Sequence, residues 1–165
     1  MQASALEPVH RTIIRPEWLD YNGHLNEAYY LLVFSHATDA LLDLIGMDDG
    51  WRRAHRMTVY TLETHLRYLR EVGVDARVEV DCRILQLDAK RLHLFHQMRG
   101  AGETALLATA EMLLVSIDAT GPRSAPWADP VRAVLDRLQA AHAERPWPEG
   151  AGRSISLGKP SQVKG

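Results

Sequence analysis

The sequence predicts an α+β fold in which an antiparallel sheet of about five strands curls around one long helix, with an extra C-terminal helix. In the first part of the chain apolar residues recur with the spacing of a helix, and in the following part they alternate with polar residues, as in strands. The turns within that second segment are too short for crossover helices, so neighbouring strands are expected to be antiparallel. With 165 residues, we expect one domain over 1–145 and a flexible tail over 146–165.

The first elements are a short strand and the long helix. His10–Arg15 is rich in β-branched residues and is stopped by Pro16. Asn26 is a good cap for a helix that runs to about Ile45, and Gly46 is suited to end it. The helical spacing is carried by Leu31, Phe34, Thr38, Leu41 and Ile45. Because most of its surface is apolar, this helix is expected to be wrapped by other structure.

The strands follow a predicted loop over Asp48–Arg56. They are expected at Met57–Arg70, Asp75–Asp88, Leu92–Met98 and Thr104–Asp118, with tight turns at Asp88–Arg91 and Gly100–Glu103. The alternation slips at Ile84–Leu85, which predicts a bulge. The closing helix is expected to have Asp129 as its cap and Pro130 in its first turn.

Composition narrows the possible partners and compartment. A net charge of −2 gives no reason to expect nucleic acid or an anionic membrane. The single cysteine, Cys82, excludes an internal disulfide and suits a reducing compartment, so we expect a cytoplasmic protein. Met1–Arg15 lacks the apolar core of a signal peptide, and no window of 18 uncharged apolar residues predicts a membrane span.

The most informative motif is Asp20–Asn26 (DYNGHLN), directly before the long helix. Asp20 can serve as base or nucleophile, or it can simply cap its own turn. Gly23 suits a positive φ angle, and His24 fits either a hydrogen-bonding strut or a general base. Free N–H groups at a helix start can hold the negative oxygen that forms at a carbonyl, which we expect near Gly23 to Asn26.

This arrangement resembles the hotdog-fold acyl-CoA thioesterases of the 4-hydroxybenzoyl-CoA thioesterase-like group. The resemblance covers about residues 8 to 120. Its motif residues are Asp20, Gly23, His24, Asn26, Tyr29 and the strand segment Glu63–Tyr68. It implies thioester hydrolysis without metal or organic cofactor, at sites in the interface of a homodimer or a dimer of dimers.

Site residues carried over from this resemblance start with Asp20, which would activate water or attack the carbonyl. Glu27 on the helix and Glu63 on a strand are the alternative carboxylates. The residues expected to bind substrate are Trp18, Gly23, His24, Asn26, Tyr29 and Tyr68. Basic residues that could meet the phosphates of CoA are Arg67, Arg70, Lys90 and Arg91.

A narrower resemblance concerns Ile14–Asp20 and Thr64–Glu71, which are similar to the betainyl-CoA thioesterases of carnitine catabolism. That substrate carries a quaternary ammonium, which aromatic faces bind. The residues that could form a cage are Trp18, Tyr21, Trp51, Tyr60 and Tyr68.

Two other functions stay open at this point. The domain could bind an acyl-CoA or another small ligand without turnover, or act as a dehydratase or hydratase on the same fold. The sequence offers no Gly-x-Ser-x-Gly element for a serine hydrolase. His93 and His96 are three apart on a predicted strand and face opposite ways, so we expect no metal site.

Overall fold

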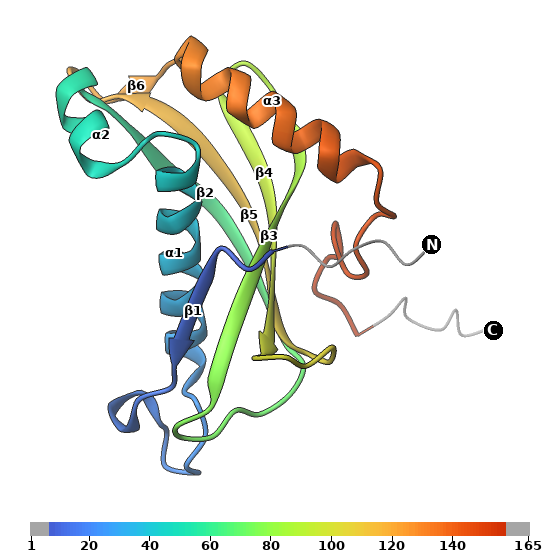
Figure 1. Cartoon of the computed structure of the whole chain (residues 1–165). Helices are drawn as coiled ribbons and strands as arrows, with labels where there is room; N and C mark the ends of the chain where they lie inside the picture. Colours follow the sequence, from blue (N-terminus) through green and yellow to red (C-terminus); the bar gives the residue numbers. More distant parts are fainter. Residues whose placement is uncertain (1–6, 158–165) are drawn as a thin grey trace, which may run out of the picture.

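A curled antiparallel sheet lies between two helices, α1 (Glu27–Leu44) on its inner face and α3 (Asp129–Ala143) on its outer face (Figure 1). The structure is a computed structural model that describes residues 7–157. The predicted fold class, a curled antiparallel sheet around a long helix with a further C-terminal helix, is confirmed.

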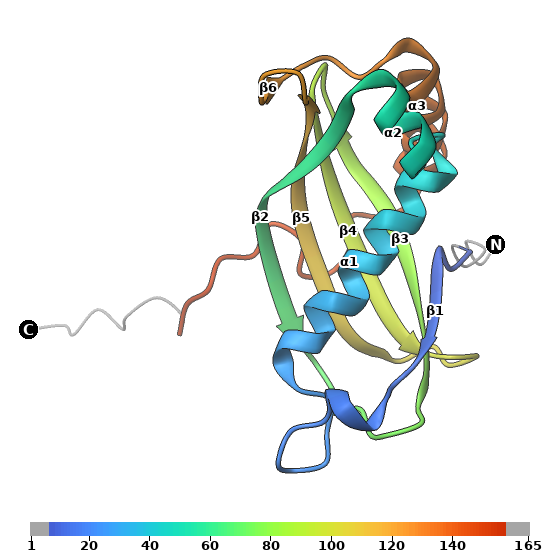
Figure 2. The same ribbon diagram turned by 90° about the vertical axis from the view of Figure 1, so that its left-hand side faces the viewer.

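The sheet has the strand order β1-β3-β4-β5-β2, and a short β6 pairs with β5. All pairings are antiparallel. Figure 2 shows α1 crossing the inner face, with β2 and β1 at the two edges. The strands are β1 (His10–Ile13), β2 (Met57–Tyr68), β3 (Arg77–Leu87), β4 (Arg91–Gly100), β5 (Leu106–Asp118) and β6 (Arg123–Ser124).

The bulge predicted at Ile84–Leu85 is confirmed, because the register of β3 against β4 shifts between Ile84 and Gln86. A second shift, between Thr61 and Glu63 of β2, was not predicted. It places Leu62 on the free edge of the sheet with an exposed side chain. Such shifts increase local twist, which helps a sheet to curl around a helix.

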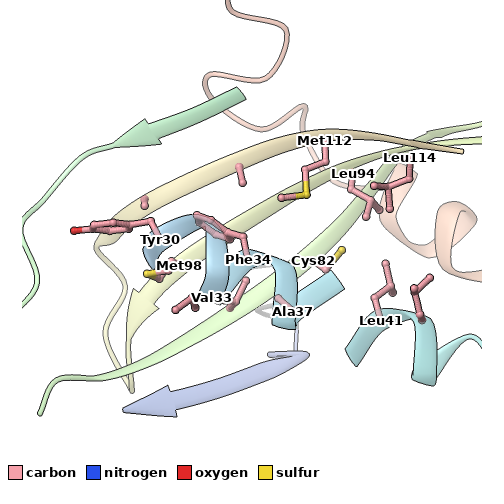
Figure 3. Packing of buried hydrophobic residues seen from close by; sticks show 14 of the residues in the cluster. Tyr30, Val33, Phe34, Ala37, Leu41, Cys82, Leu94, Met98, Met112 and Leu114 are labelled. Atoms are coloured by element: carbon pink, nitrogen blue, oxygen red, sulfur yellow. The ribbon is translucent and has the colours of Figure 1, made fainter. Parts of the chain in front are cut away.

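The core fills the space between α1 and the inner face of the sheet (Figure 3). Phe34 is fully buried and lies among side chains of β4 and β5. The alternation read from the sequence explains this, because every second residue of each strand faces the helix. The core residues drawn include Val33, Ala37, Leu41, Cys82, Leu94, Met98, Met112 and Leu114.

Two local predictions were wrong. The expected loop at Asp48–Arg56 contains a helix, α2 (Asp49–His55), whose cap Asp48 accepts a hydrogen bond from the Trp51 N–H at 2.7 Å. This helix buries none of its residues, so it has no apolar periodicity to detect. The cap of α3 is Ala128 rather than Asp129, which instead occupies the first turn, where the helix dipole favours a carboxylate.

The chain after α3 is fastened to the outer face of the sheet. The Arg83 guanidinium donates to the carbonyl of His142 in the last turn of α3, at 3.0 Å, and to the carbonyl of Pro146, just beyond that helix. Further on, the Gly152 N–H donates to the Glu111 carboxylate at 2.8 Å. Within residues 146–157, the predicted flexible tail therefore has specific contacts, and its remainder lies outside the described residues.

No single helix within residues 7–157 has the length and apolar composition of a membrane span. The pair α1 and α2 reaches both criteria only when taken together, and it is bent by 67° at the break between them.

Candidate active site

The loop before α1 holds the Asp20 carboxylate through one of its two oxygens. Asp20 Oδ1 accepts hydrogen bonds from the Asn22 N–H at 2.8 Å and the His24 N–H at 3.2 Å. Gly23, at a φ angle of 79°, permits the tight turn between them. Within the described part of the chain, Asp20 Oδ2 accepts no hydrogen bond. The turn therefore orients this side chain and leaves one oxygen available.

The first free N–H group of the helix belongs to Glu27. The N–H groups of Gly23, His24, Leu25 and Asn26 all donate within the protein, to Asp20 O, Asp20 Oδ1, Val72 O and Trp18 O respectively. By contrast, the Glu27 N–H has no acceptor in residues 7–157, as expected for the first residue of a helix. The N–H groups of Gly23 to Asn26, where oxyanion binding was expected, therefore already have acceptors, whereas the Glu27 N–H is available to one.

Asn26 caps α1 as predicted, since its side-chain oxygen accepts from the Ala28 N–H at 3.0 Å. We expect Asn26→Ala to lower the free energy of unfolding by about 1 kcal/mol, because this N–H loses its acceptor. Urea titration measures the change. Asn22→Ala is the matched control, since the Asn22 side chain makes no hydrogen bond among the described residues. Equal stability of the two variants would contradict the expected cap contribution.

A pocket of about 360 Å³ opens beside this loop. It lies between the start of α1, the end of β2 and the segment that follows β2. The segment is held against the loop, because the Leu25 N–H donates to the Val72 carbonyl at 2.7 Å. The lining residues are Asp20, Asn22, His24, Leu25, Glu27, Tyr30, Tyr68, Leu69, Arg70 and Glu71.

Two tyrosines form one wall of the pocket. The rings of Tyr30 and Tyr68 meet edge to face, with centroids 5.2 Å apart. The Tyr30 hydroxyl donates to the Arg70 carbonyl at 3.2 Å, and the Tyr68 hydroxyl donates to the Glu27 carbonyl at 3.3 Å. Burial raises the pKa of both hydroxyls, and nearby carboxylates add to the rise: Glu71 and Asp20 for Tyr30, and Glu27 for Tyr68. Both hydroxyls are therefore committed to backbone carbonyls, and carboxylates lie near both rings.

Glu71 and Tyr30 belong to the site although no role was assigned to them from the sequence. Glu71 Oε2 lies 3.5 Å from His24 Nε2, so the two side chains can form an ion pair when the histidine is protonated. Tyr30 follows the predicted Tyr29, and the helical phase decides which of the two faces the pocket. The sequence did offer one signal for them: Tyr30 directly follows the motif residue Tyr29, and Glu71 ends the similar segment Thr64–Glu71.

Trp18 and Tyr29 lie elsewhere. Their rings stack at 5.8 Å, and Trp18 is buried in the core with the Arg15 guanidinium over it. Neither residue lines the pocket, and Gly23 and Asn26 shape its loop rather than its wall. Of the predicted binding residues, the structure brings His24 and Tyr68 to the pocket beside Asp20.

The aromatic cage considered from the sequence is not assembled among residues 7–157. Trp18 is buried, Tyr21 is 97 % exposed, and Trp51 stacks on His55 at 4.1 Å in α2. Tyr60 lies on β2 with an exposed side chain and does not line the pocket. Only Tyr68 of the five candidates borders it.

A larger cavity, of about 700 Å³, lies over the outer face of the sheet and contains Glu63. Its central carboxylate, Glu111, is already bound by the Gly152 N–H and by His93 Nε2 at 2.7 Å. None of the helix starts in the described part of the chain borders this cavity. Glu63 is thus separated from the helix N-terminus, whereas the other alternative carboxylate, Glu27, lines the pocket with Asp20.

The basic residues considered for CoA lie apart from one another. Arg70 lines the pocket with Asp20, whereas Arg91 borders the outer cavity and pairs with Asp88 at 2.7 Å. Lys90 contacts Ser124 at 3.5 Å, and Arg67 lies against Gly150. In the described ranges no three His, Cys, Asp or Glu side chains gather as metal ligands. His93 is half-buried on the outer face and His96 is fully buried on the inner face.

Comparisons with known proteins concern the family and the fold of this chain. The sequence pattern of the thioesterase-like superfamily matches residues 14–135. A betainyl-CoA thioesterase of Pseudomonas aeruginosa is 48 % identical over 148 residues, covering 90 % of this chain and 93 % of that protein. An L-carnitine dehydrogenase/betainyl-CoA thioesterase of Agrobacterium fabrum is 41 % identical over 89 % of this chain and 30 % of its own length.

Among solved structures, a Staphylococcus aureus protein determined in complex with CoA superimposes with a TM-score of 0.85 at 26 % identity. The match covers 96 % of this chain and 100 % of the Staphylococcus aureus protein. The residues matched by the superfamily pattern end within the closing helix α3, at residue 135.

Proposed function

This chain belongs to the thioesterase-like superfamily, and we propose from that premise that it hydrolyses a small acyl-CoA thioester in the pocket beside Asp20. The observation that carries the proposal is that the Asp20 carboxylate lines the same pocket as Glu27, the first residue of α1, whose N–H has no acceptor among residues 7–157. A carboxylate and a helix N-terminus together supply what thioester hydrolysis requires. The CoA thioester named for the relatives supplies the substrate class.

The reaction is expected to centre on Asp20 Oδ2 and the Glu27 N–H. The carbonyl oxygen of the thioester accepts from the Glu27 N–H, where the helix dipole stabilises the negative charge that develops. Asp20 then deprotonates water, which adds to the carbonyl carbon, or attacks that carbon itself to form an anhydride that water opens. In both routes the C–S bond breaks and the CoA thiolate leaves and takes up a proton.

The acyl group is proposed to be betaine. Two relatives of this chain, at 48 % and 41 % identity, carry betainyl-CoA thioesterase in their names. The similarity to the first covers almost the whole of both chains, so it includes every element that borders the pocket. Hydrolysis of betainyl-CoA would release betaine and CoA.

We further propose a homodimer formed through the β2 edges. β2 is an edge strand, and the exposed side chains of Tyr60 and Leu62 lie along it. Open strand edges with apolar side chains favour pairing with another chain. Tyr68 ends this same strand, so a partner joined here would stand close to the pocket. The CoA substrate and the free, buried Cys82 thiol favour a cytoplasmic location.

A panel of CoA thioesters with colorimetric detection of the released thiol tests the function. Betainyl-CoA, benzoyl-CoA and acetyl-CoA are the probes, and we expect turnover of betainyl-CoA to exceed that of the other two. Calorimetric binding of betainyl-CoA without thiol release would instead support the second candidate, a protein that binds the ester without turnover. If the protein neither binds nor hydrolyses any of the three esters, both candidate functions are contradicted.

A further inference from the structure

We infer that this pocket selects cationic acyl groups mainly through the carboxylates of Glu71 and Glu27 rather than through a cage of aromatic rings. The inference rests on the proposed function, because it concerns substrate choice at the same site. It assigns to Glu71 and Glu27 the recognition of a quaternary ammonium beside the thioester carbonyl.

The first support is the charge of the pocket wall. Three carboxylates border the pocket, from Asp20, Glu27 and Glu71, against the Arg70 guanidinium and the His24 imidazole, whose Nε2 lies 3.5 Å from Glu71 Oε2. Their influence reaches the tyrosine wall, since Glu71 and Asp20 both raise the pKa of Tyr30 and Glu27 raises that of Tyr68. An acyl group placed against these rings therefore experiences a negative potential, which favours a cation and disfavours an anion.

The second support is the chemistry of the proposed substrate. In betainyl-CoA a single methylene separates the quaternary nitrogen from the thioester carbonyl. If the carbonyl oxygen is bound by the Glu27 N–H, the cation must remain within the same pocket, next to Tyr30, Tyr68 and Glu71. A permanent cation without N–H groups cannot donate hydrogen bonds, so it is attracted by charge and by ring faces alone.

The third support is the dispersal of the aromatic side chains. Trp18 is buried in the core, Trp51 stacks in α2 and Tyr21 points into solvent. The two rings at the pocket, Tyr30 and Tyr68, pack edge to face against each other and have their hydroxyls committed to backbone carbonyls. A cage that encloses a cation needs several ring faces, and this wall offers two rings. Charge selection therefore falls to the carboxylates.

The test compares two thioesters of the same shape. Betainyl-CoA and 3,3-dimethylbutanoyl-CoA differ only in the exchange of the quaternary nitrogen for carbon, so the ratio of their kcat/KM values measures charge selection. We expect Glu71→Gln to lower this ratio about fivefold at most, mostly through the KM of betainyl-CoA, as for an exposed charge pair. Glu27→Gln removes the carboxylate of Glu27 but keeps its backbone N–H. The double variant Glu27→Gln/Glu71→Gln should lower the ratio about 20-fold.

Glu17→Gln, an exposed residue outside the pocket, is the matched control and should leave the ratio unchanged. If Glu71 acts only by positioning His24, Glu71→Gln will slow both esters equally, and the unchanged ratio will overturn the inference. A parent protein that hydrolyses both esters with equal kcat/KM will overturn it as well, while the proposed function stands. Failure of the parent to release thiol from either ester counts against the proposed function itself.

Discussion

Asp20→Asn is expected to lower kcat by 100-fold or more on the true substrate while the protein keeps its fold. The amide oxygen of asparagine can still accept hydrogen bonds from the Asn22 and His24 N–H groups, which Asp20 Oδ1 accepts at 2.8 and 3.2 Å. The turn is therefore preserved, whereas the free oxygen loses its charge and can no longer take a proton or attack a carbonyl. Single-turnover kinetics with betainyl-CoA, together with circular dichroism, measures the two effects.

Glu27→Gln and Glu63→Gln are the comparisons for this experiment. Both replace a carboxylate by its amide, one inside the pocket and one in the cavity on the outer face. We expect each variant to keep kcat within about tenfold of the parent, because the proposed mechanism assigns proton transfer to neither carboxylate. Near-full turnover by Asp20→Asn, with a collapse of activity in either comparison variant, would transfer the chemistry to that other residue.

Acid should destabilise this protein through the buried His96. Its imidazole lies under α1, with a ring nitrogen 3.0 Å from the Thr38 hydroxyl and its plane stacked near Phe34. Burial lowers the pKa of His96 to about 4, from an ordinary value of 6.5. Between these two pH values the unfolded chain binds a proton that the folded chain excludes. The free energy of unfolding therefore falls, by on the order of 3 kcal/mol for this residue, as the pH drops from about 6.5 to about 4.

Below a pH of about 4 both states are protonated at His96, and this residue contributes no further loss. The pKa values of His10 and His142 are also lowered by burial, so they act in the same direction. His96→Gln retains a hydrogen-bonding side chain without a titrating group, and it should flatten the decline. Urea titrations at several pH values measure the slope, with the exposed His55→Gln as control. An undiminished slope in His96→Gln would show that other groups cause the acid loss.

The fold could be predicted largely because its signals are local. Short windows of sequence contain the change from helical to alternating periodicity, the Asn26 cap and the break in alternation at Ile84. The structure contains all three features. α2 was missed because it buries no residue and so leaves no periodic signal. The cap of α3 was misplaced by one residue, because Asp129 is favourable both as a cap and within a first turn.

The candidate site was predictable only in part, because some of its residues are close in sequence and others come from distant segments. Asp20, His24 and Asn26 belong to one continuous loop, so their grouping follows from the sequence. Glu71 and Tyr68 reach the pocket because β2 and the segment after it pack against that loop and α1, through contacts such as the hydrogen bonds from Leu25 to Val72 and from Tyr68 to Glu27. No local pattern specifies such a contact between distant segments.

By itself the sequence determined which segments form the long helix and the four long strands, and which loop carries the acidic side chain of the motif. Tertiary structure decided which N–H group at the helix start has no acceptor among residues 7–157, which tyrosine lines the pocket, and that Trp18 belongs to the core. The physical reason is that periodicity and capping act over a few residues. The occupancy of a hydrogen-bond donor and the burial of a ring depend instead on every segment that packs against them.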